Sequence, residues 1–335
     1  MIEYQRVYPG NHEPLDRVDV SGPVCDAAAA FARLPAVGRD FEFDTGGWFP
    51  DMHARANGNA GVHIGGVERK GANLLISARD CGGTAALIVA SLIADPSGQP
   101  AGGRIEQVFS LDPQHAFAGG MQRIGNLLAV PLEGANVDAC VLFLQIGNPL
   151  EPRVVASATI VRGNARACAA AITTLPDKRM LLGVIGEQKR YIGLFGARPV
   201  LDMYLSRTDD ISDGFGDPLT LMLPPRAWYA AINFTGAVAD VGLVRVGMVG
   251  LRAGPVVDFF QLQIVTPPSV RYWPTAGAAT FITAPVGKRL ALHSASIGRI
   301  SGGIAVNDDG DIAVYAASGP IADRRLRISV FCHRA

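Results

Sequence analysis

The sequence has few charged residues and no excess of either sign. Of its 335 residues, 18% are charged, with 30 basic and 30 acidic side chains, and 49% are hydrophobic. A chain this poor in charge and this rich in aliphatic residues can bury a core, which excludes intrinsic disorder. The charge balance also argues against a nucleic-acid partner, because such proteins usually carry a basic excess or stripe.

Long apolar runs and paired cysteines are also missing. No segment reaches the roughly 20 apolar residues that span a bilayer, and the N-terminus, MIEYQRVYPG, lacks the apolar core of a signal peptide. The five cysteines are far apart and include no CxxC pair, which argues against zinc and against a dense disulfide framework. We therefore expect a soluble, cytoplasmic protein without a membrane partner, or a secreted one if a leader has been removed.

What the sequence does contain is a repeat. Residues 63–77 combine Gly-Gly, an apolar residue, Glu-Arg, a Gly-containing turn and an aliphatic run, and residues 118–130 repeat this order with Gln-Arg. This pattern predicts a β-hairpin with a tight turn. Weaker copies start about 50 to 70 residues apart and cover 168–184, 229–247 and 301–315.

Further strand-like runs follow the hairpins, for example at 86–93 and 139–145. A period near 50 residues with about four strands is typical of one propeller blade. The first strand of each repeat is rich in small residues, as expected for innermost strands that crowd around the central axis of a propeller. Aliphatic residues become more frequent in the later strands, which would lie farther out, where the blades pack face to face. We predict an all-β, five-bladed β-propeller, with six blades as the alternative because 279–283 and 289–293 could begin another.

The first 58 residues lie outside the repeat. We predict an N-terminal segment at 1–58 and a propeller domain at 59–335. Residues 26–34 resemble a short helix with Asp26 as its N-cap. A strand at 3–8 or at 41–43 could close the last blade, and the segment could also cover the mouth of the central channel.

Two motifs carry a resemblance to a known family. They are Gly119-Gly120-Met121-Gln122, followed by Leu128 to Glu133, and Gly302-Gly303-Ile304 with its Asp-Gly turn and Tyr315. Over about residues 60–335 the chain resembles bacterial β-propeller proteins of largely undefined function. The resemblance implies a small propeller and no particular activity.

A propeller brings polar residues from several blades to one mouth of its channel, where we predict a single small-molecule or glycan site. His63 opens the first inner strand and His115 precedes the second. Histidine suits general acid–base chemistry, so we take His63, His115 and Glu68 as candidate catalytic residues. Each histidine also has a plain alternative as a hydrogen-bonded loop residue.

Other polar and aromatic residues are candidates for ligand binding. They are Trp48, His53, Arg69, Gln122, Arg123 and Asn233. Glu68 and Gln122 occupy equivalent repeat positions, as do Arg69 and Arg123. Equivalent polar residues often satisfy backbone groups of a neighbouring blade, which is the structural alternative for these four.

The sequence favours no cofactor. HExxH, Walker and GxSxG motifs are absent, and the acidic stretch 208–217 could hold a structural calcium ion but lacks EF-hand spacing. We consider two functions: a hydrolase, lyase or cyclase, and a non-catalytic lectin or protein-interaction scaffold. The oligomeric state and the substrate stay open.

Overall fold

The structure is a computed structural model, and its described residues cover most of the repeat region. They are residues 5–6, 26–45, 48, 62–80, 83–94, 100–163, 165–187, 199–223, 229–240, 243–252, 256–265, 279–280, 289–293, 301–306, 310–317 and 325–333. In this part of the chain, no helix combines the length and apolar character needed to cross a membrane.

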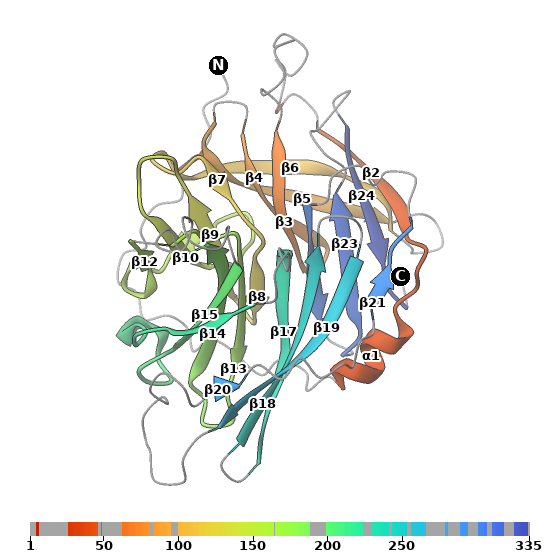
Figure 1. Cartoon of the computed structure of the whole chain (residues 1–335). Coiled ribbons are helices and arrows are strands. Elements are labelled where there is room, and N and C mark those ends of the chain that lie inside the picture. Colours follow the sequence, from red (N-terminus) through yellow and green to blue (C-terminus); the bar gives the residue numbers. More distant parts are fainter. Residues whose placement is uncertain are drawn as a thin grey trace.

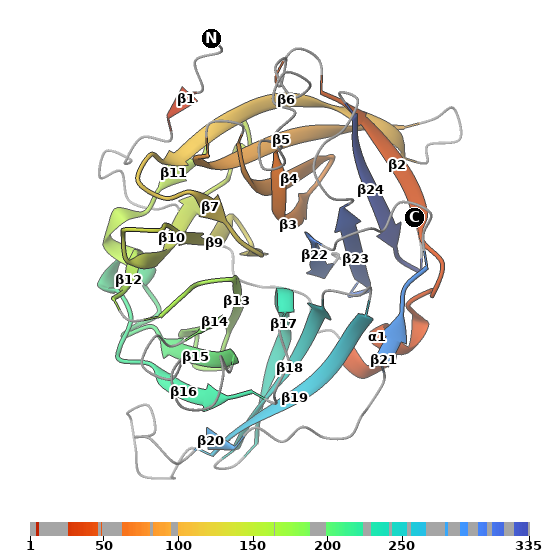
Figure 2. The ribbon, with the colours of Figure 1, turned by 45° about the horizontal axis from the view of Figure 1, so that its top comes forward.

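The described strands form five sets around a common centre (Figures 1 and 2). The first set contains β3 (His63–Lys70), β4 (Asn73–Arg79), β5 (Ala85–Ala94) and β6 (Pro100–Asp112). The second contains β7 (Phe117–Ala118), β8 (Gln122–Ile124), β9 (Leu127–Glu133), β10 (Ala139–Gln145), β11 (Arg153–Val154) and β12 (Ile160–Arg162).

The remaining sets complete the ring. The third contains β13 (Ala169–Thr174), β14 (Met180–Glu187), β15 (Pro199–Leu205) and β16 (Leu219–Met222). The fourth contains β17 (Tyr229–Asp240), β18 (Leu243–Arg252), β19 (Val256–Val265), β20 (Ala279–Thr280) and β21 (Arg289–Ala291). The fifth contains β22 (Ser301–Val306), β23 (Ile312–Ala317), β24 (Arg325–Phe331) and β2 (Arg39–Asp44).

Each predicted hairpin is present, and the all-β propeller prediction is confirmed. The segments that suggested a sixth blade instead lie at the outer edge of the fourth set, where β20 and β21 both pair with β19. We refer to the five sets as blades 1 to 5.

Each junction between neighbouring blades holds a hydrophobic cluster among the described residues. Leu75 of blade 1 packs with Leu128 of blade 2, whereas Leu74 and Ile76 pack toward Tyr315 of blade 5. Further clusters join blades 2 and 3, blades 3 and 4, and blades 4 and 5. The inner strands consist of nearly continuous runs of apolar residues because both faces of each blade are buried.

The N-terminal segment contributes to the ring closure. Strand β2 pairs with β24 of blade 5 and also, in parallel, with β6 of blade 1 through Phe43–Gly103. Strand β1 (Gln5–Arg6) lies beside β6. Two neighbouring blades therefore share one nine-stranded sheet.

Short helices complete the described structure. The predicted helix is confirmed as α1 (Ala27–Arg33), where Asp26 accepts a hydrogen bond from the Ala29 amide at 3.1 Å, and Phe31 packs at the junction of blades 4 and 5. Two 3₁₀ helices, η1 (Ala156–Ala158) and η3 (Ile211–Asp213), lie in connections of blades 2 and 3.

Candidate functional site

The inner strands approach each other backbone to backbone. A Cβ atom at Gly65 would lie 1.8 Å from the Ala118 carbonyl oxygen, and one at Gly303 would lie 1.5 Å from that of Val67. At Gly120 it would lie 2.2 Å from the Ala230 oxygen, although blades 2 and 4 are not neighbours. The described inner strands therefore leave no space at these levels for a ligand, which must bind at an end of the axis or between blades.

Three candidate residues join blades to one another. The Gln122 amide oxygen accepts hydrogen bonds from the amides of Ile172 at 2.9 Å and Phe234 at 2.8 Å, and its nitrogen donates to the Phe234 carbonyl at 3.0 Å. Asn233 donates from its amide nitrogen to the Ile304 carbonyl at 2.8 Å. The Gln122 contacts match the structural alternative stated for that residue, and Asn233 likewise satisfies a backbone group of another blade.

Glu68 does the same between blades 1 and 2. Its carboxylate accepts hydrogen bonds from the amides of Arg69 at 2.8 Å and Arg123 at 3.0 Å, and the residue is only 2% exposed. Burial raises the pKa of Glu68 to about 7, against the opposing effect of the Arg123 charge and the two amide donors.

We expect Glu68 to make stability depend on pH. In the unfolded chain the carboxyl ionises near its ordinary pKa of 4.5, whereas in the folded chain it ionises near 7. Its contribution to stability is therefore complete below about pH 4.5 and is lost as the pH rises to about 7. Urea unfolding at pH 5 and pH 8 should show a larger loss of unfolding free energy in the wild type than in Glu68→Gln. Equal losses in both proteins would contradict this.

The proposed catalytic histidines lie at the same end of blade 1 but apart. His63 is exposed and pairs with Arg79, Arg79 pairs with Ala85, and the Ala85 amide donates to the His115 carbonyl at 2.8 Å. Three strand spacings separate the two histidines, or about 14 Å. Glu68 lies five residues beyond His63 along β3, about 16 Å away. The structure does not bring the three together, and their acid–base role stays a prediction.

His115 lies in the connection between blades 1 and 2 and is enclosed by residues of both. It is 7% exposed, and its Nε2 lies 3.0 Å from the Asp138 carbonyl oxygen and 3.6 Å from the Cys140 thiol. Its Nδ1 lies 3.0 Å from Asp112 Oδ2 but without the alignment of a hydrogen bond. Burial, followed by the Asp112 charge, raises the pKa of Cys140 to about 12. A thiol held protonated in this way is a poor nucleophile.

The other predicted ligand-binding residues are dispersed. Trp48 is half-buried against the cluster between blades 5 and 1, and His53 lies outside the described residues. Arg69 and Arg123 lie together at the opposite end of the inner strands from His63, where Arg123 Nε donates to the Arg69 carbonyl at 3.0 Å.

The acidic stretch 208–217 is a loop of blade 3 whose side chains form hydrogen bonds within the loop itself. Asp210 accepts a hydrogen bond from the Ser212 amide at 2.8 Å, and Asp213 accepts one from the Thr208 hydroxyl at 2.6 Å. No group of side chains suited to hold a metal ion occurs in the described part of the chain.

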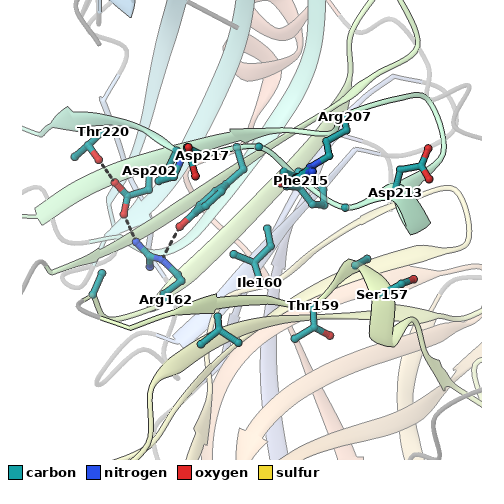
Figure 3. A pocket seen from close by; sticks show the side chains of 17 residues that line it. Ser157, Thr159, Ile160, Arg162, Asp202, Arg207, Asp213, Phe215, Asp217 and Thr220 are labelled. Atoms are coloured by element: carbon teal, nitrogen blue, oxygen red, sulfur yellow. Dashed lines mark hydrogen bonds and ion pairs between the residues drawn. The ribbon is translucent and has the colours of Figure 1, made fainter. Parts of the chain in front are cut away.

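A cavity of about 890 Å³, which no sequence pattern predicted, lies between blades 2 and 3. Figure 3 shows side chains from β12, β15, β16 and the connection 207–218 around it. Its polar residues include Ser157, Thr159, Arg162, Asp202, Tyr204, Arg207, Asp213, Asp217 and Thr220. These residues come from two different repeats and from loops, so no local sequence pattern predicts that they line one cavity.

A buried ion pair forms one wall of the cavity. Arg162 pairs with Asp202, and both side chains are less than 5% exposed. Arg162 Nε donates to the Tyr204 hydroxyl at 3.3 Å, and Thr220 donates to the other Asp202 oxygen at 2.5 Å. The donors and acceptors of this wall are fixed by one another, which holds the cavity in shape.

Other residues that line the cavity are more open to solvent. Phe215 is half-buried and stacks on Phe143 at 5.4 Å between ring centroids. Arg207 is exposed and donates from Nε to the Phe215 carbonyl at 3.2 Å. Asp217 is exposed and has no hydrogen-bond partner among the described residues. These groups can contact a ligand directly.

Comparison with known proteins identifies no family. No protein-family model matches the sequence, and no curated protein matches it. Among solved structures, a thermostable family-43 glycoside hydrolase is 10% identical, with a TM-score of 0.44 over 81% of this chain and 89% of that one. A GH43 β-xylosidase/α-arabinofuranosidase from a compost microbial metagenome is 12% identical, with a TM-score of 0.46 over 82% and 91%. A Trypanosoma rangeli sialidase is 12% identical, with a TM-score of 0.41 over 82% and 46%.

Proposed function

We propose that this β-propeller binds a neutral, hydroxyl-rich small molecule of the carbohydrate class in the cavity between blades 2 and 3. The observation that carries the proposal is a cavity lined both by the fixed polar wall and by the open groups Phe215, Arg207 and Asp217. Sugar hydroxyls both donate and accept hydrogen bonds, so they suit a site that offers carboxylate and guanidinium groups beside an aromatic ring.

Charge favours a neutral ligand over an anionic one. Two arginines and three aspartates line the cavity, which gives a formal excess of one negative charge. A polyanion would be repelled, whereas an uncharged sugar would displace water from groups that need a hydrogen-bond partner. The resemblance to bacterial propellers of largely undefined function implies no particular activity, so it does not bear on this proposal.

Asp217→Ala should weaken sugar binding about tenfold, because a charged acceptor is lost. Isothermal titration with a panel of pentose and hexose oligosaccharides measures the effect. Asp209→Ala is the matched control, since Asp209 is exposed in the same connection but does not line the cavity. Equal affinity in the two variants, or no binding by the wild type, would disprove the proposed site.

Hydrolysis of a glycosidic bond is the second candidate. It is favoured by the three carboxylates around one cavity, since this reaction uses two. Release of nitrophenol from nitrophenyl glycosides by the wild type, with loss in Asp217→Asn, would support it. Sugar binding without any such release would favour the non-catalytic alternative.

A further inference from the structure

The tyrosine in the fixed wall of the cavity between blades 2 and 3 carries a proton that the wall itself does not use. Tyr204 lies two residues after Asp202 on β15, so the two side chains point to the same face of that strand. Tyr204 packs in the hydrophobic cluster between blades 2 and 3, lines the cavity, and is 6% exposed. Packing therefore fixes the position of its hydroxyl group.

Arg162 contacts this hydroxyl group only as a donor. Its Nε donates to the Tyr204 oxygen at 3.3 Å, and its Nη2 donates to Asp202 (Figure 3). Its Nη1 donates to the Arg166 carbonyl, so the guanidinium group is held by three partners. A guanidinium group has donors but no acceptor, and Arg162 therefore cannot receive the Tyr204 proton.

No acceptor for this proton occurs in the part of the chain that the structure describes. The Tyr204 hydroxyl makes no second hydrogen bond there. Both oxygens of Asp202 already accept hydrogen bonds, from Thr220 at 2.5 Å and from Arg162. Burial raises the pKa of Tyr204, against the opposing effect of the Arg162 charge, so the hydroxyl group stays protonated at neutral pH. The wall thus presents a nearly buried donor that needs a partner.

The chemistry of this donor restricts what can bind beside it. An oxygen of a sugar hydroxyl or ether group can accept the proton. A methylene group at the same place would leave the donor buried without a partner. Sites that bind a ligand hydroxyl through a buried polar group discriminate strongly against analogues that lack it.

We propose that Tyr204 is a specificity-determining residue of this cavity, whose hydroxyl group donates to one oxygen of a bound sugar. It thereby selects sugars with an oxygen at that position over the corresponding deoxy sugars. This role rests on the proposed function and adds to it the atom of the wall that distinguishes between ligands. Arg162 is a positioning residue, because it contacts the hydroxyl oxygen and leaves the proton for the ligand.

Titration with monodeoxy sugars tests the role of Tyr204. Methyl pentosides and hexosides are titrated into the wild type by isothermal calorimetry, and the one that binds most tightly is compared with each of its monodeoxy analogues. We expect one analogue to bind the wild type about tenfold more weakly than the parent sugar because of this donor. In Tyr204→Phe this difference should shrink to less than about threefold, while the differences at other positions are retained.

Tyr229→Phe is the matched control, because Tyr229 is also buried and its hydroxyl donates to Asp258 at 3.1 Å, but it does not line the cavity. It should retain every difference of the wild type. If Tyr204→Phe also retains them, or loses affinity equally for all analogues, the role of Tyr204 is overturned while the proposed function stands.

Thermal melting identifies a Tyr204→Phe protein that has unfolded. In that case the wild type decides: rejection of one monodeoxy analogue supports the role of Tyr204, and equal binding of all analogues overturns it. Absence of sugar binding by the wild type would overturn the proposed function together with the role of Tyr204.

Discussion

Replacing Gly120 by alanine is expected to destabilise the protein by about 3 kcal/mol or more, because the added methyl group has no space. It would lie 2.2 Å from the Ala230 carbonyl oxygen and 2.8 Å from the Ala231 Cα, and both are backbone atoms. The Gly120 backbone is itself bonded to blade 3, since its amide donates to the Cys168 carbonyl at 3.0 Å and its carbonyl accepts the Ala170 amide at 2.8 Å. Neither the Gly120 backbone nor the Ala230 backbone can move away without disrupting the contacts between blades 2, 3 and 4.

Denaturant unfolding measures this effect, and Gly147→Ala provides the control. A Cβ atom at Gly147 would approach only the Asn126 side chain, at 4.0 Å, so its substitution should change stability by no more than about 0.5 kcal/mol. Similar midpoints for the two variants would show that the inner strands are not packed as described.

The second large effect is expected at Gln122. Gln122→Ala would leave two backbone amides and one carbonyl, from Ile172 and Phe234, buried without their partner. Each lost partner costs about 1–3 kcal/mol, so we expect a loss of about 3 kcal/mol or more. The residue is only 4% exposed, and water cannot easily replace the side chain.

The exposed Gln114 gives a matched control, because no hydrogen bond of its side chain occurs among the described residues. Gln114→Ala should unfold at the wild-type denaturant concentration. Gln122→Glu retains an acceptor for the two amides but cannot donate to Phe234 once ionised, so its stability should fall as the pH rises. A Gln122→Ala protein as stable as Gln114→Ala would refute the role of Gln122 in joining blades 2, 3 and 4.

The repeat made the fold predictable. Gly-Gly at 65–66, 119–120 and 302–303 marks inner strands that approach another backbone, and the five hairpins follow from local turn and strand patterns. Strand β2 is not part of any hairpin, and the sequence left two segments open for its place. Its pairing with β24 and β6 depends on the closed ring.

The candidate site was far less predictable. Glu68, Gln122 and Asn233 were identified as polar residues of inner strands, but their hydrogen bonds go to the backbone of other blades. Arg162, Asp202 and Phe215 carry no repeat signature and come from outer strands and a connection. A polar residue in a repeat can serve a blade junction or a ligand, and the amino-acid type alone does not distinguish the two.

The architecture of this protein can be predicted from its sequence, because strand periodicity and turn residues are local properties that recur along the chain. The folded ring sets which polar residues form hydrogen bonds at blade junctions and where a cavity stays open. Those outcomes depend on distances between residues 40 or more positions apart, such as Arg162 and Asp202. Closure of the ring fixes these distances, and no stretch of sequence encodes them alone.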